Sequence, residues 1–148
     1  MRPFFLLALA CIVRSAVAEE NFPVVLLDTK DAAGHRVKFQ TDLKTLFSTP
    51  RWTFYADGSD PPLSIGAAAG AAQKAALLRA PKADGISLGS MRFLRRDVAY
   101  SGGGFPVWFY VFAFQPVFTT GPAGLKLGPV MEIVILLDRT AIYPTRAK

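Results

Sequence analysis

The sequence predicts an α+β domain in which one long alanine-rich helix packs on an antiparallel sheet, in the order helix–strand–strand–strand, with a β-hairpin before the helix. Three observations predict this fold class. Residues 63–79 are rich in alanine, the strongest helix former. Three apolar, β-branched and aromatic segments follow that run. Two shorter apolar segments, separated by a polar turn, precede it.

The first eighteen residues predict export. A basic start at Arg2 is followed by an unbroken apolar run over residues 4–13, and Ala16-Val17-Ala18 has small residues at its first and third places. This is the layout of a secretory signal peptide that is cleaved after Ala18. The apolar run is shorter than the ~20 residues that a transmembrane helix needs. We therefore expect residues 1–18 to be removed and the protein to work in the periplasm or outside the cell.

The only cysteine, Cys11, lies inside this predicted signal peptide. The exported chain would therefore have no disulfide and no thiolate metal site. Cys11 also allows an alternative, because the preceding Ala8-Leu9-Ala10 partly matches the triplet that precedes the acylated cysteine of bacterial lipoproteins. Acylation would anchor the chain to a membrane. We favour the unanchored form, since alanine stands where that triplet has leucine.

Residues 19–60 are expected to form an N-terminal hairpin and a linker within the same domain. Residues 22–27 are apolar and β-branched, and residues 35–40 alternate polar with apolar side chains, which is typical of a half-buried strand. A short helix is expected next, with Thr41 or Asp42 as its N-cap.

Residues 61–148 are expected to hold the helix and a three-stranded sheet. Ser64 is suited to cap the helix, and Pro81 lies just beyond its end. Gln73, Lys74 and Arg79 interrupt its apolar character, so no transmembrane segment is expected in the exported chain. Small residues would line its packing face, because small side chains interdigitate with large ones. We assign that face to Gly66, Ala67, Gly70, Ala71 and Ala75.

The three strands are predicted over residues 86–94, 107–117 and 130–137, the last extended through Tyr143. The second is apolar at both odd and even positions, which favours a central strand covered on both faces. Its even positions carry rings that we expect to meet the helix. These rings are Trp108, Tyr110, Phe112 and Phe114. Residues 95–104 combine charges with three glycines and are expected to form a flexible, solvated connection.

Residues 61–146 resemble cystatin-like domains, and more narrowly the small exported domains similar to PepSY. The resemblance rests on the alanine-rich helix, Ile86–Leu94, the Trp108-Phe109-Tyr110-Val111 start of the central strand, and Val134–Asp138 running to Tyr143-Pro144. Arg139 stands where such families commonly have a glycine. The resemblance implies an inhibitory, chaperone-like or binding role in the cell envelope, without a cofactor.

No pattern of residues predicts catalysis. His35 is the only histidine, and no serine lies in a nucleophile motif. Glu132 is a lone carboxylate in an apolar strand, whereas a glycosidase uses two facing carboxylates. We therefore predict no enzyme, no catalytic residues, no metal and no cofactor. A hydrolase that uses carboxylates unrecognised in the sequence is the alternative.

The candidate partner-binding residues are basic or lie in a glycine-rich segment. The whole chain has a formal net charge of +6, which favours anionic partners. Because export separates the chain from nucleic acid, an unknown protein or an anionic envelope component is the expected partner. The sequence thus predicts a small exported binding domain of the bacterial envelope, with an inhibitor of an envelope protease as an alternative. The candidate residues are Arg92, Arg95, Arg96, Gly102, Gly103 and Gly104.

Overall fold

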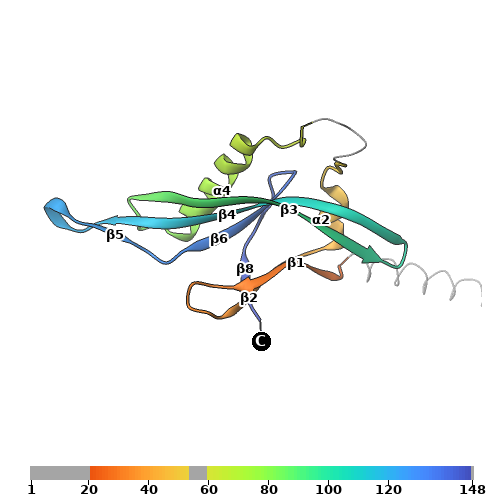
Figure 1. The fold of residues 1–148 in the computed structure, drawn as a ribbon, viewed down its shortest axis with the longest axis horizontal. Helices are drawn as coiled ribbons and strands as arrows, with labels where there is room; N and C mark the ends of the chain where they lie inside the picture. Colours follow the sequence, from red (N-terminus) through yellow and green to blue (C-terminus); the bar gives the residue numbers. More distant parts are fainter. Residues whose placement is uncertain (1–20, 54–59, 148) are drawn as a thin grey trace, which may run out of the picture.

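The structure, a computed structural model, describes residues 21–53 and 60–147. The predicted signal peptide, its cleavage site after Ala18 and the candidate lipidation site Cys11 lie outside this part. The predicted fold class is wrong. The chain is mostly β, with two sheets and only short helices, instead of a long helix on a three-stranded sheet (Figure 1). Strands dominate because the N-terminal hairpin belongs to a sheet of its own and because residues 95–100 continue a strand.

The smaller sheet joins the two ends of the described chain. The N-terminal hairpin pairs antiparallel with a bulge between Val25 and Leu27, and Phe39 lies opposite Pro144 of the last strand. This sheet has the order β1 (Pro23–Lys30), β2 (Arg36–Asp42) and β8 (Pro144–Arg146).

The larger sheet is built on one long antiparallel hairpin, in which Gly85 pairs with Val117 and Tyr100 with Gly103. The predicted flexible connection over residues 95–104 is therefore wrong, because only Ser101 and Gly102 lie between the two strands. Gly103 has a φ of 131°, which explains a glycine at the turn. The strands run β3 (Gly85–Tyr100), β4 (Gly103–Thr119), β6 (Met131–Leu136) and β7 (Ala141–Ile142), and β5 (Leu125–Leu127) pairs with the end of β4.

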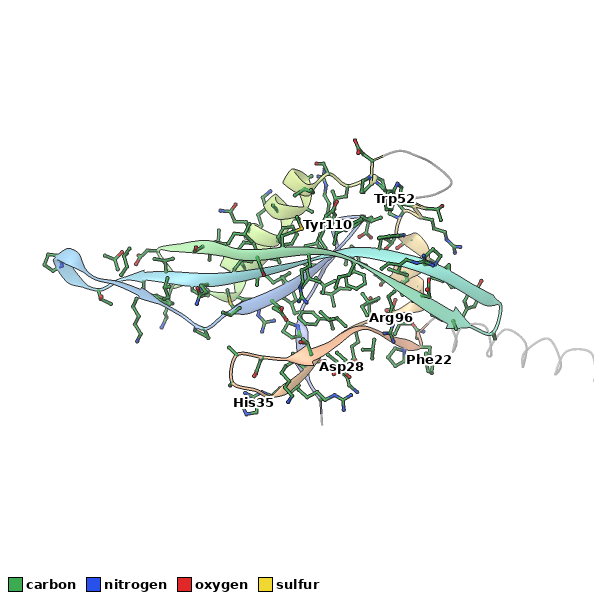
Figure 2. The ribbon with its side chains drawn as sticks, viewed as in Figure 1. Phe22, Asp28, His35, Trp52, Arg96 and Tyr110 are labelled. Carbon is green, nitrogen blue, oxygen red and sulfur yellow. The ribbon has the colours of Figure 1, made fainter. Side chains whose placement is uncertain are left out.

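Strand β4 separates two hydrophobic cores, as its apolar residues at both odd and even positions predict. Phe109 and Val111 pack with residues of the smaller sheet, such as Phe39. Tyr110 and Phe112 pack in the other core. All five of these side chains are almost fully buried. Figure 2 labels Tyr110 on the side of the larger sheet that carries the longer helix, away from the smaller sheet.

Two α-helices and one short 3-10 turn complete the described fold. Asp42 caps the first helix through a 2.7 Å hydrogen bond from the Thr45 backbone N–H, and Ser64 caps the second through a bond from the Ala67 N–H. Both caps agree with the sequence. No helix among the described residues is long and apolar enough to cross a membrane. The elements are α2 (Leu43–Ser48), α4 (Ile65–Arg79) and η1 (Gly121–Ala123).

The packing face of α4 agrees with the predicted one only in part, since Ala75 is buried and Ala67 and Ala71 pack against the core as predicted. The predicted ring face of β4 does share a core with α4, but the buried helix residues are Ala68, Ala72, Ala75 and Ala76. Gly66 is exposed, and a Cβ added at Gly66 or Gly70 would meet no atom within 4 Å. The assignment of both glycines to the contact is therefore wrong. Methyl groups, not glycines, provide the close approach to the rings.

Arg139 lies in the turn between β6 and β7 and adopts a backbone conformation that favours glycine. Arg139 has a φ of 74°, the left-handed region that costs an L-residue ~1 kcal/mol or more. The Arg139 N–H donates to the Leu136 carbonyl at 2.9 Å, and the Thr140 N–H donates to the Asp138 carboxylate at 2.9 Å. The turn thus imposes a glycine-like conformation on an arginine.

Substitutions in α4 test its packing face. Gly70→Ala is expected to raise the free energy of unfolding by roughly 0.5–1 kcal/mol, because the added methyl enters open space and alanine favours the helix. Ala72→Leu is expected to lower it by about 1–3 kcal/mol through overpacking. Chemical denaturation measures both. Destabilisation by Gly70→Ala would instead place Gly70 in the contact.

Arg139→Gly is expected to raise the free energy of unfolding by about 0.5–1 kcal/mol, because glycine adopts the left-handed conformation without a Cβ clash. Arg139→Val, at the same exposed position, is the matched control. A β-branched residue is a poor fit to positive φ, and this variant is expected to melt at a lower temperature than the wild type. Equal stability of the glycine and valine variants would contradict the assignment.

Candidate functional site: a basic cleft between the sheets

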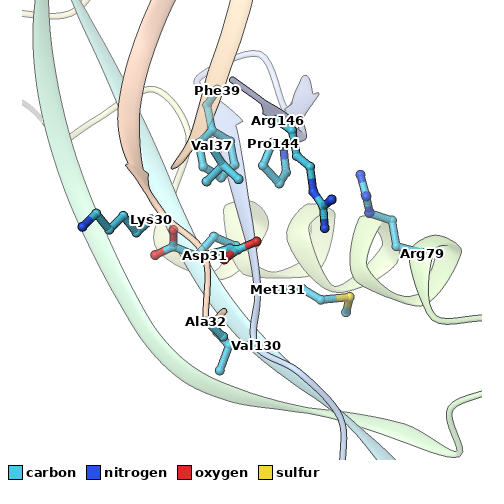
Figure 3. Close-up of a pocket in the computed structure, with 11 residues that line it drawn as sticks. Lys30, Asp31, Ala32, Val37, Phe39, Arg79, Val130, Met131, Pro144 and Arg146 are labelled. Atoms are coloured by element: carbon cyan, nitrogen blue, oxygen red, sulfur yellow. The ribbon is translucent and has the colours of Figure 1, made fainter. Parts of the chain in front are cut away.

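The candidate site is a cleft of about 590 Å³ where the smaller sheet meets β6 and the C-terminal end of α4 (Figure 3). Apolar side chains from both sheets form part of its wall, among them Phe39 of β2 and Met131 of β6. Five charged residues also line it: Lys30, Asp31, Arg79, Glu132 and Arg146. They come from four distant parts of the chain, so only the tertiary fold brings them together.

The two carboxylates of the cleft already have partners. Glu132, which is half-buried, accepts a hydrogen bond from the Arg92 guanidinium at 2.9 Å. Asp31 accepts hydrogen bonds from the backbone N–H groups of Ala33 and His35, at 3.0 and 2.8 Å. The His35 backbone N–H is the main reason that the pKa of the Asp31 carboxyl lies below its usual value. Both carboxylates are thus engaged by groups outside the cleft.

The three cations of the cleft, in contrast, form no ion pair with any carboxylate of the described residues. Lys30 is the last residue of β1, Arg79 the last of α4, and Arg146 the last of β8. Arg79 instead lies over the Tyr143 ring, with 4.9 Å between its guanidinium carbon and the ring centroid. All three side chains are exposed and retain their capacity to bind an anion.

The sequence-predicted arginine cluster is not one patch. Antiparallel neighbours point to the same face of a sheet, so Arg92 and Arg96, opposite Val111 and Val107, face the smaller sheet. Arg95, opposite Trp108, faces the α4 side. Figure 2 labels Arg96 on the side of the sheet opposite Tyr110.

Two of these arginines also have carboxylate partners. Arg92 is held by Glu132 at the cleft, and Arg95 donates to Asp97 at 2.7 Å. Arg96 forms no ion pair within the part of the chain that the structure describes. Gly102, Gly103 and Gly104 are exposed at the hairpin end, and Gly104 shares a hollow of about 360 Å³ with Arg95. The structure thus brings Arg95 and Gly104 together and leaves Arg92 and Arg96 apart from them.

Sequence reasoning missed Lys30, Asp31, Arg79 and Arg146 as site residues. No spacing signal relates them, because the pairing of β8 with β2 and the end of α4 set their positions. From the sequence, Arg79 stands out only as a polar interruption of the alanine-rich helix. Among the described residues there is also no group of three His, Cys, Asp or Glu side chains suited to a metal ion.

Comparison with protein-family models, with curated proteins and with solved structures found no match to this chain. The resemblance to PepSY-like domains therefore stays a prediction from the sequence.

The pKa of Asp31 offers a test of the cleft geometry. We expect its carboxyl to titrate below the ordinary value of 3.8, as measured by carboxyl NMR. The stability it contributes is present above that ordinary value and is lost as the pH falls through the folded-state pKa. His35→Ala should keep most of the depression, because the backbone N–H remains. Return of the pKa to 3.8 in that variant would assign the effect to the imidazole.

Proposed function

We propose that this chain is a small exported, non-enzymatic binding domain of the bacterial envelope, and that its cleft binds an anionic envelope component. The observation that carries the proposal is the imbalance of charge in the cleft. Among the described residues, Lys30, Arg79 and Arg146 line it without a carboxylate partner. Of its two carboxylates, Glu132 is neutralised by Arg92, and Asp31 keeps its charge but is hydrogen-bonded to backbone N–H groups. A phosphate or carboxylate group of an envelope lipid or polymer supplies the missing anion.

The cleft also suits binding by its composition. Val37, Phe39 and Met131 form an apolar part of its wall, and the charged residues line the rest of it. An apolar wall with a few polar groups is the usual composition of a ligand site. Among the described residues that line the cleft there is no serine, cysteine or histidine. The exported location rests on the predicted signal peptide.

One observation favours the second candidate, a carboxylate-based hydrolase. The fold places Asp31 beside the same cleft as Glu132, which supplies the second carboxylate that the sequence did not reveal. The lowered pKa of Asp31 suits only the ionised member of such a pair, which leaves Glu132 as the general acid. The ion pair between Glu132 and Arg92 weighs against that role, because it already engages the Glu132 carboxylate. Loss of a measured turnover in both Asp31→Asn and Glu132→Gln would favour the hydrolase.

Anion binding is tested with the full chain by calorimetry against a short polyphosphate and by co-sedimentation with phosphatidylglycerol vesicles. Arg79→Gln and Arg146→Gln are each expected to weaken binding about tenfold, because one charge-assisted hydrogen bond contributes ~1.5 kcal/mol. Affinity should also fall as ionic strength rises.

Lys82→Gln is the matched control, since it removes the same charge from an exposed residue outside the cleft. Phosphatidylcholine vesicles control for the lipid surface. If Lys82→Gln weakens anion binding as much as the two arginine variants do, the effect comes from the net charge of the protein and not from the cleft. If none of the three variants changes the affinity, the cleft is excluded as the binding site.

A further inference from the structure

Strand β3 forms an open edge of the larger sheet. It spans sixteen residues, stands at the end of the strand order and pairs only with β4 among the described strands. Residues 87–92 are all exposed, whereas a strand covered on one face alternates between buried and exposed positions. Its outer backbone N–H and C=O groups are therefore available to another strand.

A bulge in β3 places two exposed apolar residues on the same face. Pairing with β4 shifts between Leu88 and Ser90, so that Leu88 lies opposite Phe114 and Met91 opposite Phe112. Both rings belong to the core beneath α4. Leu88 and Met91 are 52% and 36% exposed, and so the edge carries uncovered apolar surface at its centre.

We propose that this edge pairs with β3 of a second copy of the chain, antiparallel, about a two-fold axis between Gly89 and Ser90. This axis bisects the exposed run over residues 87–92. It places Leu88 opposite Met91 of the second copy, and the two bulges meet at the axis. Because the apolar pair then occurs twice and on one face, the interface is self-complementary, as a two-fold axis requires.

The charges along β3 favour the same register. Asp84, whose carboxylate accepts a hydrogen bond from the Thr119 N–H at 2.6 Å, lies just before the strand and opposite Arg95 of the second copy. Arg95 is bonded to Asp97 of its own chain, so Asp84 adds a second carboxylate to it, and symmetry repeats this arrangement. Arg92 lies opposite Ser87 of the second copy, so it avoids another arginine. A parallel or shifted alignment loses these matches and separates the bulges. Pairing with a second copy thus accounts both for the exposed Leu88 and Met91 and for the positions of the charged residues along β3. A strand from another protein would account only for the open edge.

The oligomeric state of the full chain tests the proposal. Sedimentation velocity over a range of concentrations is expected to show a monomer–dimer equilibrium. Met91→Lys places a charge at the centre of the interface and should raise the dimer dissociation constant at least about tenfold. Leu125→Lys, at a 74% exposed leucine of β5, is the matched control and should leave dimerisation unchanged. Thermal melting checks that both variants remain folded.

The register is tested by disulfide cross-linking in a Cys11→Ser background, which removes the only natural thiol. The double variant Leu88→Cys/Met91→Cys places facing thiols across the axis and should form a covalent dimer on oxidation. Leu88→Cys alone and Met91→Cys alone face a methionine and a leucine, and neither should cross-link.

Three results would overturn the proposal. A chain that stays monomeric at all concentrations leaves the edge for some other strand. A dimer that persists in Met91→Lys lies on another surface. Cross-linking of the single-cysteine variants as efficient as that of the double variant excludes the register. None of these results bears on anion binding in the cleft, because neither Leu88 nor Met91 lines it.

Discussion

The whole fold depends on β4 having no solvent-exposed face along its middle. Its odd-numbered side chains complete the core beneath the smaller sheet, and its even-numbered rings complete the core beneath α4. The Tyr110 hydroxyl also reaches the Leu63 carbonyl at 2.8 Å, which ties the segment before α4 to the strand. Strand β6 contributes to the same two cores, with Val134 and Leu136 on one face and Ile133 and Ile135 on the other. Strands β4 and β6 therefore join the two layers together, and burial of apolar area on both of their faces stabilises both layers.

That arrangement determines where a site can form. Along the middle of β4, side chains fill both faces, so the cleft opens farther along, where β6, α4 and the smaller sheet approach one another. Strand β8 brings Arg146 there, and the last turn of α4 brings Arg79. The candidate site is thus a consequence of how the layers are joined, and its charges come from the ends of elements, where backbone direction changes.

The sequence predicted elements better than their assembly. The alternation in β4, the Ser64 cap and the Asp42 cap are local patterns, and each appears in the structure. The contact face of α4 was predicted only in part, because alanines and glycines occur on all sides of the helix and no apolar stripe distinguishes one side. Arg95 and Arg96 resembled a solvated connection, but an edge strand tolerates charges on both faces. The pairing of β8 with β2 leaves no local signal, and the cleft depends on it.

This pairing also has a consequence for how the chain acquires its structure. The Thr145 hydroxyl donates to the Lys38 carbonyl across a separation of 107 residues, within the β2–β8 ladder. Contacts so distant along the chain close late, because the loop entropy must be lost before they form. During synthesis, the hairpin of β1 and β2 therefore lacks its third strand until Arg146 has been added to the chain. The interval before that closure is when the nascent chain is most open to chaperones and proteases.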